Sequence, residues 1–325
     1  MLKHNITLVN IHFPGHEVLF WALLKRLWLF HGTIVLSFHG GDTTQIRLER
    51  SPYQRLLWRL ILADVTALTA CSRQLSDKLK ELFPWASTKV HVVPNGVDVS
   101  AIAAESRSHR DLLGNGMTFY LISIAGFEPE KGLDVLLAAF APLRVQWPAL
   151  RLLLLCRAGP NRQAIDALIQ QLAIADWVSI EVDCPHDRAM SLLTGAEALV
   201  VPSRKEAFGI VVLEAAALGK PVILTDVCGV LEWLDGSLVT IVPPADAVAL
   251  GRAIARVLSH KQIADTQAQR LKIAASETLS WSHAATLLLT AAGEVAGAAP
   301  SAGMAAQTDN ASQHRTADAR RPTAD

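Results

Sequence analysis

The sequence predicts an α/β protein with two doubly wound, Rossmann-like parallel sheets, and three observations favour this fold class. Short apolar runs alternate with helical patterns at the spacing of βα units up to about residue 295. A polar, irregular stretch at 100–116, SAIAAESRSHRDLLGNG, divides the alternation into two series. Each polar cluster follows a predicted strand, and the carboxyl ends of parallel strands are where such sheets bind ligands.

The first series predicts a domain at residues 1–105. Ser72 is of a residue type that caps helix N-termini, and Pro94-Asn95-Gly96 has the composition of a turn. We expect strands at 6–12, 33–39, about 65–70 and 89–93, and helices at 17–30, about 52–62 and 73–83.

The second series predicts a domain at residues 106–295. Residues 296–325 hold hardly any large apolar side chain, and we expect this tail to be disordered. The predicted strands are 118–124, 151–156, 178–182, 198–201, 222–225 and 238–242. The predicted helices are 134–147, 163–172, 188–193, 209–218, 245–258 and one more that ends near 295.

The composition is that of a globular protein. Of 325 residues, 51% are hydrophobic and 18% are charged, which suffices for a core in each of two domains. The formal net charge is zero, but residues 1–110 carry 13 Lys and Arg against 8 Asp and Glu, and the remainder carries 17 against 22. This asymmetry indicates two domains rather than nucleic-acid binding, and it leaves an anionic or membrane-surface acceptor open.

The cysteines and histidines give no sign of a disulfide framework or a metal site. Cys71, Cys156, Cys184 and Cys228 are widely spaced in or beside apolar segments, and the N-terminal residues lack a secretory pattern. We therefore expect reduced thiols in a cytoplasmic protein. No histidine has the spacing of zinc ligands, so neither a metal ion nor another cofactor is expected.

One stretch, residues 16–38, is apolar enough to suggest a membrane. Lys25, Arg26 and Gly32 interrupt it, which predicts a helix followed by a strand. A buried crossover helix is one interpretation of this segment. The other is contact with a bilayer surface, because basic residues stand beside four aromatic side chains, Phe20, Trp21, Trp28 and Phe30.

The main candidate site lies in residues 200–225, VVPSRKEAFGIVVLEAAALGKPVILT, which predict strand, loop, helix and strand. Glu206 falls in the loop and Glu214 about five residues into the helix, a rise of roughly 7 Å. Both carboxylates can therefore face one elongated ligand. Lys131, after another strand, can add a positive charge for a diphosphate. The first helical turn would offer an anion the backbone amides of Phe208, Gly209, Ile210 and Val211.

Each of these residues has a structural alternative. Lys131 and Glu206, taken singly, are typical of solvated loops, and His39 before two glycines is typical of a turn. Glu214 is harder to explain in this way, because a carboxylate in an apolar helix needs a partner. The chain has neither GxGxxG nor GxxxxGK[ST], so a dinucleotide oxidoreductase and a P-loop protein lose their main support.

Four motifs, in order and with matching spacing, resemble the retaining nucleotide-sugar glycosyltransferases of family 4, which have the GT-B fold. The resemblance covers residues 5 to about 295 and implies two Rossmann-like domains that face a cleft. It also implies a UDP- or GDP-hexose donor that needs no metal ion. The motifs are VPNGVD (93–98), PEKGLDVLLAAF (129–140), VPSRKEAFGIVVLEAAALGKPVI (201–223) and TDVCGVLEWL (225–234).

The resemblance also implies roles for individual residues. Glu214 would bind the ribose, Glu206 and the amides after it the transferred sugar, and Lys131 the diphosphate. His39 and Asn95 would border the cleft from the first domain, which makes Lys131, Glu206 and His39 the expected catalytic residues. The donor phosphate would take the acceptor proton, with attack on the face of the leaving group. The loops 157–160 and 182–185 would frame the base.

The sequence departs from the family pattern at two places. Members usually carry an arginine five residues before the lysine, as a second diphosphate-binding residue, and Gly126 stands there in this chain. Losing one charge-assisted contact costs about 1.5 to 3 kcal/mol. In addition, the predicted strand at 6–12 resembles a later strand of the family's first domain, so we expect the first domain to be incomplete.

Three hypotheses remain at this stage. The leading one is a glycosyltransferase that moves a hexose to a lipid-linked or polysaccharide acceptor. The second is a truncated or degenerate relative that binds nucleotide weakly or supports a partner, and Gly126 motivates it. The third is a GT-B epimerase, which shares the fold but not the two-glutamate motif.

Overall fold

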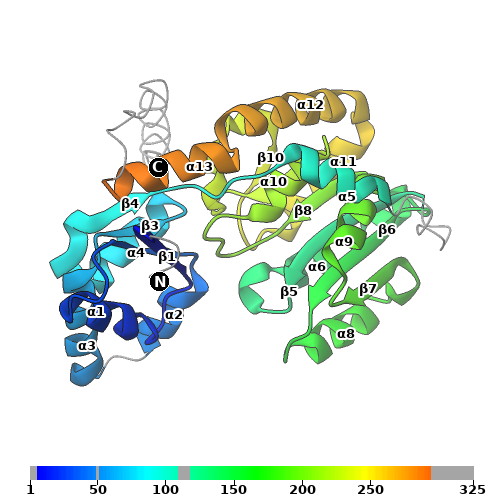
Figure 1. Ribbon diagram of the computed structural model, residues 1–325. Helices are drawn as coiled ribbons and strands as arrows, with labels where there is room; N and C mark the ends of the chain where they lie inside the picture. Colours follow the sequence, from blue (N-terminus) through cyan, green and yellow to red (C-terminus); the bar gives the residue numbers. More distant parts are fainter. Residues whose placement is uncertain (1–5, 49–50, 109–117, 294–325) are drawn as a thin grey trace, which may run out of the picture.

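The computed structural model describes residues 6–48, 51–108 and 118–293, which form two parallel β-sheets with helices packed against them (Figure 1). The predicted α/β class with two parallel sheets is confirmed. The tail at 296–325, which we expected to be disordered, lies outside the described residues, as does the part of the predicted linker at 109–116.

The first sheet has the strand order β1-β2-β3-β4, and all neighbouring strands are parallel. Because this order follows the sequence, the described part of the sheet winds in one direction only. Helix α1 ends earlier than predicted, since Trp28 has a φ of 59° and cannot continue it. The elements are β1 (Leu8–His12), α1 (Val18–Arg26), β2 (Thr33–Phe38), α2 (Gly41–Leu48), α3 (Pro52–Asp64), β3 (Ala67–Ala70), α4 (Arg73–Leu82), η1 (Pro84–Lys89) and β4 (Val90–Val92).

The second sheet has the order β10-β9-β8-β5-β6-β7, also parallel throughout. Winding runs from β5 to β7 and then resumes at β8 on the other side of β5. The sheet is therefore doubly wound, and its topological switch point lies between β5 and β8. Its strands are β5 (Tyr120–Gly126), β6 (Arg151–Arg157), β7 (Val178–Val182), β8 (Ala198–Val201), β9 (Val222–Thr225) and β10 (Thr240–Val242).

Eight α-helices of the described chain accompany or follow this sheet. None of the described helices is both long and apolar enough to cross a bilayer. The helices are α6 (Leu133–Phe140), α7 (Leu143–Gln146), α8 (Arg162–Gln171), α9 (His186–Gly195), α10 (Ile210–Ala217), α11 (Ala247–Ser259), α12 (Lys261–Thr278) and α13 (Trp281–Ala291). Short 3-10 turns lie at η3 (Pro129–Lys131), η4 (Ala175–Trp177), η5 (Gly229–Glu232) and η6 (Gly236–Leu238).

Three sequence-based assignments were wrong. The predicted linker begins with a helix, α5 (Val99–Ser108), which packs on α9 and α10. The helix predicted at 134–147 is two helices, α6 and α7, interrupted at Ala141-Pro142 because proline cannot continue an i to i−4 hydrogen-bond ladder. The final predicted helix is also two helices, α12 and α13, and Ser280 caps the second through the His283 amide.

The two halves of the chain contact each other through loops. The Glu232 carboxylate, after β9, accepts hydrogen bonds from the backbone amides of Arg73 (2.6 Å) and Gln74 (3.3 Å). An acceptor from the second half thus satisfies the N-terminal amides of α4. After α12 the chain returns to the first half. The backbone of Ser280 pairs there with Val97, and α13 then packs on β3 (Figure 1).

Candidate functional site

A cavity of about 480 Å³ lies at the carboxyl ends of β5, β6, β7 and β8, at the switch point of the second sheet. This is the place where doubly wound sheets bind ligands. The strand-end loops and the start of α10 supply its walls, which contain two fixed cations, Lys131 and Arg157, and three carboxylates, Asp183, Glu206 and Glu214.

Glu206 and Lys131 form an ion pair inside this cavity. Lys131 Nζ lies 2.8 Å from Glu206 Oε2, and the two side chains are 30% and 15% exposed. Ser203 Oγ also donates to Glu206 Oε2 at 3.3 Å. The backbone of Glu206 pairs with Cys228, which fixes the loop against the chain after β9. The carboxylate is therefore held in place before a ligand arrives.

A second set of contacts joins the loop of Lys131 to the loop of Glu206. Arg204 forms a two-pronged ion pair with Asp134, at 2.7 and 2.6 Å, and donates to the Pro129 carbonyl at 2.8 Å. The Arg204 amide donates to the Glu130 carbonyl at 2.7 Å. Gly132 makes this approach possible, because its φ is 67° and a Cβ there would lie 2.1 Å from the Pro202 carbonyl oxygen.

Helix α10 begins at the cavity, after Gly209 in the left-handed region with a φ of 92°. The N-cap residue Gly209 has no side chain that could cap the helix, and the Val212 amide bonds to the Gly209 carbonyl at 2.9 Å. The amides of Ile210 and Val211, which precede it, are placed to meet an anion. Gly209, Ile210 and Val211 line the cavity, whereas Phe208 is not among the lining residues and is buried, with 3% of its surface exposed. The helix terminus and Lys131 thus offer an anion both a partial and a full positive charge.

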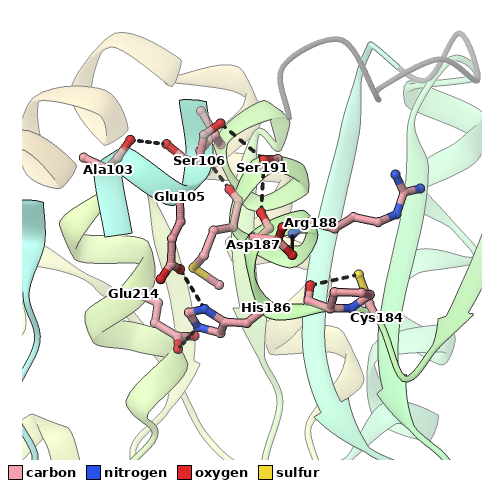
Figure 2. Close-up of polar contacts among 12 residues, drawn as sticks. Ala103, Glu105, Ser106, Cys184, His186, Asp187, Arg188, Ser191 and Glu214 are labelled. Atoms are coloured by element: carbon pink, nitrogen blue, oxygen red, sulfur yellow. Dashed lines mark hydrogen bonds and ion pairs between the residues drawn. The ribbon is translucent and has the colours of Figure 1, made fainter. Parts of the chain in front are cut away.

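Glu214, 15% exposed, has a partner that the sequence did not identify. His186 Nε2 lies 3.0 Å from Glu214 Oε1, and His186 Nδ1 lies 2.8 Å from Glu105 Oε2 (Figure 2). Partial burial alone would lower the pKa of His186, but hydrogen bonds and charge from Glu214 and Glu105 outweigh it and raise this pKa. The imidazolium form, which donates from both nitrogens, fits this geometry.

The polar residues at the strand ends of the first sheet form a separate chain of hydrogen bonds. Thr69 donates to Ser37 (2.9 Å), Ser37 donates to Asn10 (2.8 Å), and the Asn10 amide donates to His12 Nε2 (3.1 Å). His12 Nδ1 must then carry the proton, and it lies 2.9 Å from His39 Nε2. The chain ends on His39, whose Nε2 is therefore occupied as an acceptor.

His39 lies near the second half but outside the cavity lining. Asp42 accepts from the His39 and Gly40 amides, both at 2.9 Å, which holds the loop in place. A Cβ on Gly40 would lie 2.7 Å from the Ala207 Cβ, so this loop abuts the residue after Glu206. Burial is the main cause that lowers the pKa of His39, and His12 adds to this effect against the opposing charge of Asp42.

The structure brings most of the predicted site residues together. Phe208, which is buried, His39 and Asn95 are not among the lining residues of the cavity. Sequence reasoning did not identify His186 or Glu105. The only signal was that the Glu214 carboxylate, in an apolar helix, needs a partner, which favours a cationic side chain nearby. The predicted residues that line the cavity are Lys131, Glu206, Glu214, Gly126, Gly209, Ile210 and Val211.

The cysteines behave as packing residues. All four are free, and three of them, Cys71, Cys156 and Cys228, are buried. Cys156 and Cys184 line the cavity, and burial is the main cause that raises the pKa of each thiol to about 12. These thiols are therefore neutral near pH 7 and are poor nucleophiles.

Comparison with known families confirms the resemblance in the motifs. Residues 105–277 match the group 1 glycosyl transferases, and residues 1–101 match glycosyltransferase family 4. The D-inositol 3-phosphate glycosyltransferase of Segniliparus rotundus is 29% identical over 72% of this chain and 55% of its own length. The glycogen synthase of Mycobacterium tuberculosis is 28% identical over 70% of this chain and 53% of its own. The chain thus spans about half the length of these relatives.

Solved structures share the fold at lower identity. The UDP-forming trehalose-phosphate synthase of Burkholderia xenovorans has a TM-score of 0.73 at 17% identity, over 91% of this chain and 76% of its own. HepE of Anabaena, in complex with UDP and glucose, has a TM-score of 0.71 at 17% identity, over 90% and 78%. With two parallel-sheet α/β domains and these relatives, the chain belongs to the group 1 glycosyl transferases and has the GT-B fold.

Proposed function

We propose that the chain is a retaining hexosyltransferase that uses a UDP- or GDP-hexose as donor and a lipid-linked or polysaccharide acceptor. The observation that carries the proposal is the single cavity that gathers Lys131, Glu206, Glu214 and the start of α10. A nucleoside-diphosphate sugar has a diol, two phosphates and a sugar in a row, and these groups match the three kinds of partner. Solved relatives of the same fold hold UDP or UDP-glucose.

In this proposal the two halves divide the work. Residues 106–295 bind the donor: Glu214 takes the ribose hydroxyls, Lys131 and the α10 amides take the diphosphate, and Glu206 takes the hexose. Residues 1–105 face the acceptor, with His39 and Asn95 at the border. Lys131 Nζ contacts Glu206 at 2.8 Å, and because its ammonium has three N–H donors it can bind a donor phosphate beside this contact.

The transfer step needs no nucleophile from the protein. The acceptor hydroxyl oxygen forms a bond to the anomeric carbon on the face from which the diphosphate departs, and the bond between that carbon and the phosphate oxygen breaks. The electron pair stays on the phosphate, which takes the acceptor proton. The positive partners of the diphosphate stabilise the charge that grows on it in the transition state.

The alternative is a relative that binds nucleotide without catalysis, and Gly126 is the observation that favours it. The purified chain should be incubated with UDP- and GDP-hexoses, first alone for binding and then with lipid-linked and glycan acceptors for turnover. Binding with release of UDP or GDP that depends on acceptor supports the transferase. Binding without any turnover would support the alternative, and the absence of both would contradict the two proposals.

We further propose that the first half contacts an anionic membrane at the cytoplasmic face. Helices α1 and α3 pack side by side (Figure 1). Each buries one apolar stripe and exposes a second at i, i+3 and i+7. The exposed stripes are Phe20, Leu23 and Leu27 on α1 and Tyr53, Leu56 and Leu60 on α3. At the end of α1, Trp28 is 78% exposed. We call these seven residues the α1/α3 face.

The charges beside the α1/α3 face suit anionic lipid headgroups. Arg55 and Arg59 are exposed on α3, and no ion pair among the described residues involves either of them. Arg59 also stacks on Trp85, with 5.0 Å between the guanidinium carbon and the ring centroid. Apolar and aromatic side chains flanked by arginines are typical of proteins that bind the surface of an anionic bilayer.

Flotation with vesicles tests this membrane contact. Vesicles with phosphatidylglycerol should carry the chain upward, and pure phosphatidylcholine vesicles should not. Leu27→Ser/Trp28→Ser and Arg55→Glu/Arg59→Glu should each reduce flotation at least about fivefold, because apolar area and charge act together. The matched control is Ile263→Ser/Ile273→Ser on α12, where the two side chains are 62% and 58% exposed, against 64% and 78% for Leu27 and Trp28. Equal flotation of all variants, or none by the wild type, contradicts the membrane contact.

A further inference from the structure

In the family that the sequence resembles, an arginine usually stands five residues before the lysine, and in this chain Gly126, at the end of β5, stands there. Gly126 has no side chain, so Lys131 is the cation that the segment after β5 contributes to the cavity lining. Lys131 is already paired with Glu206. Without a further fixed cation, Lys131 and the partly charged His186 would face three carboxylates in the cavity lining, Asp183, Glu206 and Glu214. Such a balance disfavours a diphosphate, which itself carries at least two negative charges.

Strand pairing places Arg157 beside Gly126. The two residues are register partners in the parallel pair β5 and β6, and neighbouring strands lie about 4.8 Å apart. An arginine side chain is long enough to bridge that spacing. Arg157 is exposed, and both Arg157 and Gly126 line the cavity.

Side-chain alternation puts Arg157 on the correct face of the sheet. Successive residues of a strand point to opposite faces, and register partners share a face. Tyr120 and Ile122 on β5, and Leu153 and Leu155 on β6, belong to the core on the side of α9 and α10. Continuing by two residues leads to Gly126 and Arg157. Both therefore face the side on which Glu214 and His186 lie.

We propose that Arg157 binds the donor diphosphate in place of the arginine missing at residue 126. This proposal rests on the proposed nucleotide-sugar donor. No hydrogen bond or ion pair among the described residues engages the Arg157 side chain, so its guanidinium is available for a phosphate. A guanidinium can donate two parallel hydrogen bonds to one phosphate, which a lysine cannot do. The Glu128 carboxylate lies beside Gly126, since a Cβ on residue 126 would be 1.9 Å from Glu128 Oε2.

The resemblance to the family had implied that the loop 157–160 frames the base, and the two roles can be separated. Affinities for UDP and for uridine, and for GDP and guanosine, should be measured by calorimetry on wild type and on Arg157→Gln. A phosphate contact predicts that the nucleoside diphosphate binds about 10- to 100-fold more weakly, with nucleoside affinity unchanged. Arg157→Lys should recover part of the loss, because it restores the charge without the fork.

The control variant is Arg151→Gln, at the opposite end of the same strand and outside the cavity lining. It should leave both affinities unchanged. An equal loss for nucleoside and diphosphate in Arg157→Gln would assign Arg157 to the base or ribose and overturn the proposal, as would no loss at all. If the wild type binds neither UDP nor GDP, the proposed donor itself fails, and that outcome is recognised before any variant is made.

Discussion

The two halves of the molecule both place polar side chains at strand ends, but they do so in different ways. In the second half, Lys131, Glu206, Glu214 and Arg157 surround one cavity of about 480 Å³. In the first half, the polar groups of β1, β2 and β3 bond to one another in a chain that ends on His39. The second half holds ion pairs around its cavity, Lys131 with Glu206 and His186 with Glu214, whereas the first half joins its polar side chains in one chain of hydrogen bonds.

This difference follows from sheet topology. The second sheet reverses its strand order between β5 and β8, and the loops after these strands diverge and leave a crevice. The described part of the first sheet has no reversal, and its strand-end side chains bond across neighbouring strands. A cavity of about 500 Å³ also lies in this half, beside Phe13 and Asp42 and outside that chain of hydrogen bonds. We infer that the second half recognises the donor by itself and that the first half acts on what is already bound there.

The largest expected effect is on the transfer rate, and donor affinity then distinguishes the residues of the second half from His39 in the first half. Glu206→Ala and Glu214→Ala should each lower the transfer rate at least about 100-fold, as the loss of a preorganised polar partner does in active sites. Both should keep a native circular dichroism spectrum. His39→Ala should slow transfer but leave donor affinity unchanged, because His39 is outside the cavity lining. Steady-state kinetics and calorimetry on the three variants provide the measurement.

Two outcomes would break the comparison. If His39→Ala weakens donor binding as much as Glu214→Ala does, the first half belongs to the donor site. If Glu214→Ala unfolds the chain, the carboxylate is structural, and its contact with His186 at 3.0 Å serves the fold rather than a ligand.

The fold was predictable to the extent that its signals are local. Apolar runs and the residues that follow them identified the strands of the second sheet within about two residues, and hence the loops that build the cavity. The helix at Val99–Ser108 was not predicted, since Ser, Glu and Arg make the segment look like a linker. Packing on α9 and α10 stabilises it in spite of this composition.

The candidate site was predictable residue by residue but not in its pairings. Glu206, Glu214 and Lys131 stand in recognisable motifs. The contacts of Glu214 with His186, and of His186 with Glu105, join residues 28 and 81 positions apart. The alignment of Gly126 with Arg157 depends on the register of two strands. Such pairings follow from tertiary structure, which no periodicity in the sequence reports.

A smaller effect is the loss of stability when a glycine is replaced by alanine, compared between the loop of Lys131 and the loop of His39. Gly132→Ala, in the loop of Lys131, should lower the free energy of unfolding by about 1 to 3 kcal/mol for the left-handed φ alone. The contact of 2.1 Å with the Pro202 carbonyl adds to this loss. Gly41→Ala, beside His39, is the control, since its Cβ would meet nothing within 4 Å. Urea denaturation measures both, and equal stabilities would contradict the tight joining of the Lys131 and Glu206 loops.

The smallest effect is the pH dependence of stability, which we expect to have one sign for His186 in the second half and the opposite sign for His39 in the first half. The pKa of His186 is raised above 6.5, so its contacts with Glu214 and Glu105 stabilise the fold fully below 6.5 and are lost as pH rises through the raised value. The pKa of His39 is lowered, mainly by burial, so the folded state loses stability as pH falls below 6.5. The Tm difference between wild type and His186→Gln should therefore shrink from pH 6 towards alkaline pH. For wild type and His39→Gln it should shrink as pH falls.

The expected change for His186 is about 2 °C or less, because solvent screens a side chain that is 53% exposed. Melting curves at half-unit steps of pH are sufficient to detect it. The same sign for both variants would mean that one of the two contact sets is wrong. Opposite signs would show that the pKa of His186 is raised beside Glu214 and that the pKa of His39 is lowered in the first half. A histidine that gains positive charge beside the cavity favours a phosphorylated ligand, as proposed for the second half.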